Sequence, residues 1–179
     1  MHMLLASKLG ALGVLISDLG ERVSGDLSSS AAALLLTLRF RSALTATELA
    51  DIAGIAQPTA VRVLDGLIRR GLVVRQQRRG RQAPLRLTTL GRKRAREFLS
   101  ARLRALGDLL SAFSDDERAE LAALVNKLLS AATTSRAFAR MTCRLCDHGA
   151  CDGPRCPIGS RATELERAAE IALHGGATC

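Results

Sequence analysis

The stretch that decides the fold runs from Thr45 to Gly71 and reads Thr45-Ala-Thr-Glu-Leu-Ala-Asp-Ile-Ala-Gly-Ile-Ala-Gln-Pro-Thr-Ala-Val-Arg-Val-Leu-Asp-Gly-Leu-Ile-Arg-Arg-Gly71. Thr45 and Glu48 form a capping-box pattern, which predicts the start of a short helix directly after Thr45. Gly54 ends that helix, and Pro58 suits the first turn of a second helix, which stops at Gly71. Two helices joined by a short turn that contains glycine predict a helix-turn-helix unit.

Two short strands are expected directly after this unit, at residues 72–75 and 84–87. The segment that joins them is basic and polar and contains Gly80, as expected of a hairpin with a long tip. The expected fold is therefore mainly α with a small β-wing: a winged helix-turn-helix with a helical dimerisation region. Its parts are an N-terminal dimerisation helix (1–27), the winged helix-turn-helix (28–90), further dimerisation helices (91–140) and a cysteine-rich extension with a short C-terminal helix (141–179).

Helical periodicity predicts the remaining elements on both sides of the unit. Ser28 to Ser30 offer N-caps for a buried helix, Thr88 or Thr89 caps a long one, and Ser114 with Glu117 forms a second capping box. The expected helices span residues 4–23, 31–40, 89–113, 115–140 and 160–173.

Positive charge is concentrated in one part of the sequence. The chain has 179 residues and a formal net charge of +9, and residues 69–104 hold 13 of its 26 Lys and Arg residues, with Glu97 as their one acid. Such clustering favours a phosphate-binding surface over a solvated basic face. The sequence contains neither Trp nor Tyr, so it offers almost no stacking platforms of the kind that single-strand and RNA readers use. Double-stranded DNA is the partner that these features favour.

The chain resembles the MarR (multiple antibiotic resistance regulator) family over about residues 5 to 140. The resemblance rests on three stretches of the sequence. These are Glu48-Leu-Ala-Asp51 with Ile55-Ala-Gln-Pro-Thr-Ala-Val-Arg-Val-Leu-Asp-Gly-Leu67, then Arg69-Arg-Gly-Leu-Val73, and Leu85-Arg-Leu-Thr-Thr-Leu-Gly91.

The resemblance implies which residues approach DNA. Arg62 would pair with guanine and Gln57 with adenine, and Arg81 stands at the family's wing arginine. Arg79 replaces an Asp that the family usually carries, and Gly80 replaces a second arginine, so this wing is more basic than usual. The DNA-binding residues that we expect are Gln57, Pro58, Thr59, Val61, Arg62, Arg75, Arg78, Arg79 and Arg81.

A homodimer that binds a palindromic operator is also implied by the resemblance. Residues 4–23 and 121–129 support it, because they carry more apolar side chains than one small winged domain can cover. The family usually has a small-molecule pocket between its DNA-binding and dimerisation regions. We therefore expect a transcriptional regulator, with repression as its mode of action and a small-molecule effector as a possible partner.

Four cysteines within fourteen residues form the second candidate site: Cys143, Cys146, Cys151 and Cys156, spaced C-x2-C-x4-C-x4-C. Their spacing equals that of a zinc knuckle, although the glycines of the knuckle are missing, and Cys156-Pro157 is like the end of ferredoxin cysteine loops. An iron–sulfur cluster, a zinc ion and a metal-free thiol switch remain open. The cluster is favoured over zinc because a sensor needs a state that changes, and zinc has no redox chemistry. The cations Arg144, His148 and Arg155 are expected to lower thiol pKa values.

Other classes of function fit less well. A thiol oxidoreductase would need a βαβ context around Cys143 and Cys146, and the sequence has no Ser/His/Asp set, phosphate loop or HExxH motif, so no enzyme is expected. A non-specific architectural DNA binder and a regulator with a purely structural zinc site remain alternatives. No apolar run reaches the roughly 18 residues of a membrane span, and the N-terminus lacks the pattern of a signal peptide. We expect a cytoplasmic protein without a membrane partner.

Overall fold

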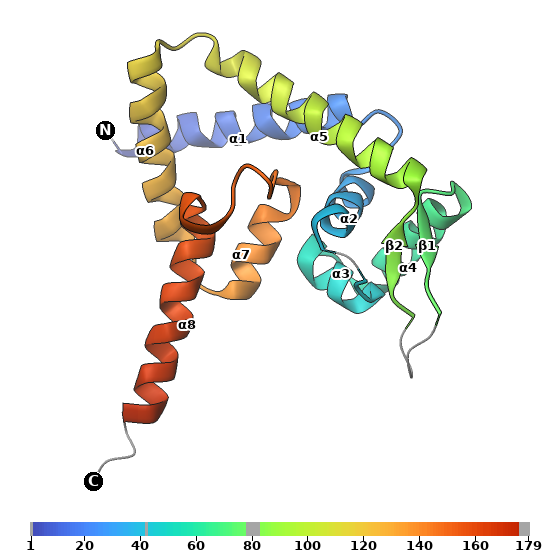
Figure 1. Cartoon of the computed structure of the whole chain (residues 1–179). Helices are drawn as coiled ribbons and strands as arrows, with labels where there is room; N and C mark the ends of the chain where they lie inside the picture. Colours follow the sequence, from blue (N-terminus) through green and yellow to red (C-terminus); the bar gives the residue numbers. More distant parts are fainter. Residues whose placement is uncertain (1, 42, 78–82, 176–179) are drawn as a thin grey trace.

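The computed structural model describes residues 2–41, 43–77 and 83–175. The winged helix-turn-helix lies at one end of the molecule, α1 and α5 run from it toward the other end, and α6 leads back down to α7 and α8 (Figure 1). The elements in order are α1 (His2–Ser24), α2 (Ser29–Phe40), α3 (Ala46–Ala53), α4 (Gln57–Arg69), β1 (Val73–Arg75), β2 (Leu85–Leu87), α5 (Thr89–Leu110), α6 (Asp115–Ala132), α7 (Arg136–Thr142), the short 3-10 turns η1 (Cys143–Leu145) and η2 (Gly153–Arg155), and α8 (Pro157–Gly175).

The helix-turn-helix forms where the capping pattern predicts it. The Thr45 hydroxyl accepts the Glu48 N–H at 3.2 Å, and the Glu48 carboxylate accepts the Thr45 N–H at 2.8 Å, so two free donors at the start of α3 are satisfied. Gly54 and Gly71 end α3 and α4 with φ angles of 69° and 68°, a conformation that glycine adopts without strain. The predicted turn and the two predicted helices are confirmed.

The hydrophobic core is built around α2. Its side chains are buried along almost the whole helix, and Leu34 and Leu36 are fully buried. Leu49 of α3, Leu64 of α4 and Leu85 of β2 are fully buried in the same cluster. The helix-turn-helix and the wing therefore share one core and form one rigid unit.

The wing is a two-stranded antiparallel hairpin, as predicted. Val73 of β1 lies opposite Leu87 of β2, and Leu44 adds one further bridge to Leu85. Helix α5 begins directly after β2, with Thr88 as its N-cap, and approaches β1 so closely that an added Cβ at Gly91 would lie 1.9 Å from the Leu72 carbonyl oxygen. The wing and the start of α5 therefore move together.

The single helix predicted for residues 115–140 is wrong. Helix α6 ends at Ala132, and a separate helix, α7, begins at Arg136. The Thr133 hydroxyl donates to the Leu129 carbonyl, and the Ser135 hydroxyl accepts the Phe138 N–H at 3.0 Å, so these residues end one helix and cap the next. Helix α7 is therefore a separate element that leads into the cysteine segment. Smaller differences are that α5 ends at Leu110 and that α8 starts at Pro157, where proline suits a first turn.

Helices α1 and α6 leave apolar side chains exposed. On α1 these include Leu4, Leu9 and Leu12, and on α6 Leu124 and Leu128. By length and composition, α1 is also apolar enough to cross a membrane, with a mean hydropathy of 1.5 over 18 residues and none of that window buried. This corrects the sequence-based expectation on span length.

Candidate functional site

One face of α4 is buried and the other faces solvent. Ala60, Leu64 and Leu67 form the buried stripe, while Gln57 and Arg62 are exposed. A helix that is anchored on one side and polar on the other is the arrangement that a recognition helix needs in a major groove. Of the other residues expected to approach bases, Pro58 is exposed and Thr59 and Val61 are half-buried.

Gln57 is held by the preceding helix. Its side-chain amide donates to the Thr47 hydroxyl of α3 at 3.1 Å, and this bond fixes the side chain at the start of α4. Arg62 has no hydrogen bond or ion pair to any of the residues that the structure describes, so its guanidinium is free to meet an external partner.

Arg75 has a role inside the protein that the sequence did not reveal. Its guanidinium donates to the Asp65 carboxylate of α4 at 2.7 Å, and this ion pair joins the wing to the predicted recognition helix. Arg78, Arg79 and Arg81, which we expect at the wing tip, lie outside the described residues. Arg86 and Arg92 of the basic stretch 69–104 surround a cavity of about 200 Å³ beside β2, together with Arg39 of α2, which the sequence did not single out.

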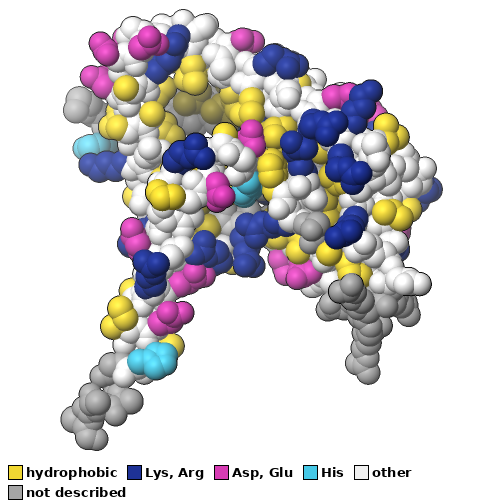
Figure 2. Space-filling view, viewed as in Figure 1, with side chains coloured by type: hydrophobic (Ala, Val, Ile, Leu, Met, Phe, Trp, Pro, Cys, Tyr) yellow, Lys and Arg dark blue, Asp and Glu magenta, His cyan; other side chains and the backbone are white. Residues whose placement is uncertain are grey.

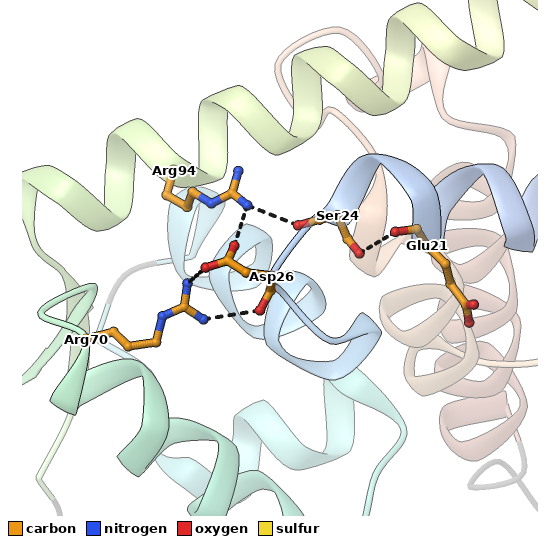
Figure 3. Close-up of polar contacts among 5 residues, drawn as sticks. All are labelled: Glu21, Ser24, Asp26, Arg70 and Arg94. Atoms are coloured by element: carbon orange, nitrogen blue, oxygen red, sulfur yellow. Dashed lines mark hydrogen bonds and ion pairs between the residues drawn. The ribbon is translucent and has the colours of Figure 1, made fainter.

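A polar clamp ties α4 and α5 to the loop between α1 and α2. Asp26 accepts hydrogen bonds from Arg70, just after α4, and from Arg94 of α5, the latter at 2.7 Å (Figure 3). Arg94 also donates to the Ser24 carbonyl at 3.0 Å. The hydrogen bond from Arg94, with a smaller effect of the Arg70 charge, holds the pKa of Asp26 below its usual range. Nothing in the local sequence marks Asp26, because its partners lie 44 and 68 residues away.

The four cysteines come together in space as they do in sequence. Cys143 is buried and Cys146, Cys151 and Cys156 are half-buried, and all four are free thiols. The Cys156 sulfur also accepts the Gly159 N–H at 3.2 Å. Within the described ranges, no three His, Cys, Asp or Glu side chains form a group already arranged to hold a metal ion.

Contacts among the thiols separate their pKa values. A hydrogen bond to Cys146, and then burial, raise the pKa of Cys143, while the same bond lowers the pKa of Cys146 to about 7. Burial, and then the neighbouring Cys156, raise the pKa of Cys151 to about 11 despite the opposing charge of Arg155. The cation that lowers the pKa of Cys146 is Arg102 of α5, which sequence spacing alone does not connect with the cysteines.

The cysteine segment packs directly against the helix-turn-helix. η1 packs against α2, with Leu145 on the main core, and α7 packs against α3. The His148 ring lies 5.1 Å from the Phe40 ring, and its Nε2 lies 3.1 Å from the Cys143 carbonyl oxygen. The Met141 sulfur approaches Gly54 so closely that an added Cβ there would lie 2.9 Å away.

Comparison with known proteins identifies the central part of the chain. Residues 26–82 match the MarR family. The chain is also similar to the structure of a MarR family protein from Bacillus stearothermophilus, with 25% identity, a TM-score of 0.64, and coverage of 69% of this chain and 89% of that one. No curated protein matches the chain by sequence.

Two further structures are similar in fold. One is MepR, a transcription regulator of the Staphylococcus aureus multidrug efflux pump MepA, with 23% identity, a TM-score of 0.59, and coverage of 68% of this chain and 95% of that one. The other is Rv2887 of Mycobacterium tuberculosis in complex with salicylic acid, with 23% identity, a TM-score of 0.57, and coverage of 69% and 95%. MepR is a transcription regulator, and Rv2887 is a MarR family protein, in agreement with the expectation from the sequence that the chain is not an enzyme. Each of the three comparisons leaves part of this chain without a counterpart.

Proposed function

Because residues 26–82 carry a MarR family domain, we propose that the chain is a transcriptional regulator that binds a specific sequence of double-stranded DNA as a homodimer. Repression is the proposed mode of action, since a dimer seated on an operator blocks other proteins from the same DNA. The recognition residues proposed are Gln57, Pro58, Thr59, Val61 and Arg62 on α4, with Arg75, Arg78, Arg79 and Arg81 from the wing.

The observation that carries this proposal is the exposed face of α4, where Arg62 pairs with none of the described residues, beside a wing whose sequence is basic. Arg62 presents a planar donor pair suited to guanine, and Gln57 presents an amide suited to adenine. The bond between Gln57 and Thr47 supports Gln57 in a fixed position, so less side-chain entropy is lost on binding. Arg75 supports recognition indirectly, because its ion pair with Asp65 sets the angle between wing and helix.

The proposed dimer rests on the apolar surface of α1 and α6. Leu4 is 64% exposed, Leu124 60% and Leu128 55%, and isolated proteins rarely leave so much apolar surface in water. A second copy of the chain, rather than a membrane, covers this surface in our proposal, and the cytoplasmic location expected from the sequence is retained. Lys8, Asp18 and Glu21 on α1 favour a protein partner over lipid.

We further propose that Cys143, Cys146, Cys151 and Cys156 hold a metal centre, either an iron–sulfur cluster, which we favour, or a zinc ion. The fit rests on the donor set: four neighbouring thiols, one buried and three half-buried, with a backbone N–H directed at the Cys156 sulfur. Metal binding would draw the thiols closer together. When bound, a cluster supplies a redox-sensitive charge, and zinc supplies a fixed brace.

The contacts of the extension give this centre a route to DNA binding. The route runs through α7, because α7 lies against α3 and Met141 lies against the turn at Gly54. Rearrangement of the cysteine segment would move Met141 and Arg140 and loosen the support of α3. A small-molecule effector, such as the salicylic acid bound to Rv2887, is a further possible input.

Selection from a pool of random duplexes tests DNA recognition. We expect the purified protein to enrich a palindromic sequence and to bind it at least 1,000-fold more tightly than a scrambled duplex, on the order expected for specific binding. Equal affinity for both duplexes would instead support the alternative of an architectural, non-specific binder.

Metal analysis and an absorption spectrum of anaerobically purified protein test the centre. A brown protein with iron and sulfide supports the cluster, and a colourless protein with bound zinc supports a structural site. A variant with all four cysteines changed to serine should lose the metal in either case. A wild-type protein that holds neither metal under these conditions would contradict the proposal and leave the thiol switch.

A further inference from the structure

A second cavity lies between α2, α7 and α8, on the extension side of the helix-turn-helix. Its volume is about 610 Å³, which is within the range of small-molecule sites. The residues that line it include Arg41 after α2, Arg136 and Arg140 of α7, and Arg167 of α8. Lys and Arg side chains gather on the face of the molecule between the α7–α8 side and the α2–α3 side (Figure 2).

The positive charge in this cavity is only partly balanced. Arg136 is neutralised by Glu166, with an N–O distance of 2.6 Å, and Glu164 pairs with Arg161. Asp152 and Glu164 are the carboxylates of the described lining. Among the described residues, no carboxylate forms an ion pair with Arg41, Arg140 or Arg167, so these three guanidinium groups share the lining with two carboxylates.

Arg41 shows that the charges crowd one another. It is half-buried and lines the cavity together with Arg136 and Arg140. Gathering like charges costs free energy unless an anion is present. Arg41 and Arg140 also line a neighbouring cavity of about 520 Å³ with Glu48 and Asp51 of α3, which places both arginines beside the helix-turn-helix.

We propose that the cavity between α2, α7 and α8 binds a small anion that carries carboxylate or phosphate groups, with Arg41 and Arg140 as its main donors and Arg167 at the rim. Guanidinium groups bind both kinds of oxyanion through paired N–H donors. This site is separate from the recognition surface, because none of its described lining residues belongs to α4 or to the wing strands. The cysteine segment contributes Cys143, Cys151 and Cys156 to one wall.

Calorimetric titration of the full-length protein with inorganic phosphate and with succinate tests the site, with uncharged succinamide as the control ligand. We expect saturable binding of one anion per chain and none of succinamide. Binding of succinate alone identifies a carboxylate ligand, and binding of phosphate alone identifies a phosphoryl ligand. Absence of saturable binding for both anions would overturn the proposal.

Two variants and a matched control locate the binding. Arg41→Gln and Arg140→Gln should each lower the affinity for the anion by about tenfold, the loss expected when one charged hydrogen bond is removed. Arg96→Gln removes an exposed arginine of α5 that does not line the cavity and should leave affinity unchanged. Unchanged melting curves show that the variants fold, and equal weakening by all three changes would refute the site.

A regulatory role of this site rests on the proposed function, and separate experiments can refute anion binding and DNA binding. If the anion occupies the cavity, saturating anion should change the affinity of the wild-type protein for its selected duplex, and Arg41→Gln should remove that response. A protein that binds the anion but no DNA would leave the site standing and refute the proposed function. A protein that binds DNA but neither anion would refute the site alone.

Discussion

Arg62 is the residue on which base recognition depends most in our proposal. Arg62→Ala should weaken binding to the selected duplex by about 1–3 kcal/mol and relax the preference at one base position, because a bidentate contact with a base is lost. Competition titrations with duplexes altered at single positions measure this effect.

Lys127→Ala serves as the control for Arg62→Ala. Lys127 is an exposed cation on α6, which lies at the other end of the molecule from α4 (Figure 1). If both changes weakened binding equally and left the base preference unchanged, Arg62 would not contact a base, and the prediction would be wrong.

Asp26 gives a pH-dependent prediction. Its pKa is lowered in the folded protein, chiefly by Arg94, so its ionised form stabilises the fold at any pH above the usual aspartate pKa of about 3.9. That contribution disappears as the pH falls through the lowered pKa. Asp26→Asn should therefore lower the melting temperature at pH 7, and the difference from wild type should vanish in strong acid. A difference that stays constant between pH 7 and pH 2 would show that charge is not its cause.

At the scale of elements, the packing of α7 on the helix-turn-helix is tested at two glycines. Gly54→Ala and Gly71→Ala both force a side chain into a left-handed conformation, at φ 69° and 68°. The backbone cost is about 1–2 kcal/mol at each. An added Cβ at Gly54 would meet the Met141 sulfur, whereas no described atom lies within 4 Å of an added Cβ at Gly71. Chemical denaturation should show the larger loss for Gly54→Ala.

A double variant completes this test. Met141→Ala in the Gly54→Ala background should recover the steric part of the loss and leave the backbone part. If Met141→Ala behaved the same in both backgrounds, α7 would not be docked on the turn, and the proposed route from the cysteines to α3 would be wrong.

The elements that could be predicted from the sequence are those with local signals. Thr45, Glu48, Gly54 and Gly71 mark both helices of the helix-turn-helix within a few residues of their observed ends. The break between α6 and α7 could not be predicted from leucine periodicity, because that pattern continues toward it. The break depends on the Thr133 hydroxyl, which ends one helix, and on the Ser135 hydroxyl, which caps the next. The wing strands were predicted because β-branched and apolar residues alternate with basic ones on either side of a glycine.

The site was predictable in composition but not in arrangement. The spacing of the cysteines predicts that the four thiols lie together, and the family resemblance predicts which face of α4 approaches DNA. The pairing of Arg75 with Asp65, the clamp at Asp26 and the approach of Arg102 to Cys146 depend on tertiary packing between distant segments. No local pattern encodes such contacts, and the same holds for the arginines around the cavity beside α7.

At the scale of the whole molecule, the exposed leucines of α6 test the dimer. Leu124→Lys should reduce the particle mass from twice 19.0 kDa to 19.0 kDa in sedimentation experiments, because a charge cannot be buried unpaired in an apolar interface. Leu90→Lys is the control, since Leu90 is 54% exposed and lies at the start of α5 rather than on α1 or α6. A dimer that survives Leu124→Lys but not Leu90→Lys would place the interface elsewhere.

Because Gly91 lies in close contact with the Leu72 carbonyl, the wing and α5 rotate together as one rigid body. The helix has 22 residues and is about 33 Å long at 1.5 Å per residue, with the wing fixed to one end and α6 following the other. A tilt of about 6° at the far end therefore carries the wing by about 3.4 Å, the rise of one base pair along a strand. Small rotations between the two copies of the chain would be enough to bring the wings into or out of register with the grooves of a duplex.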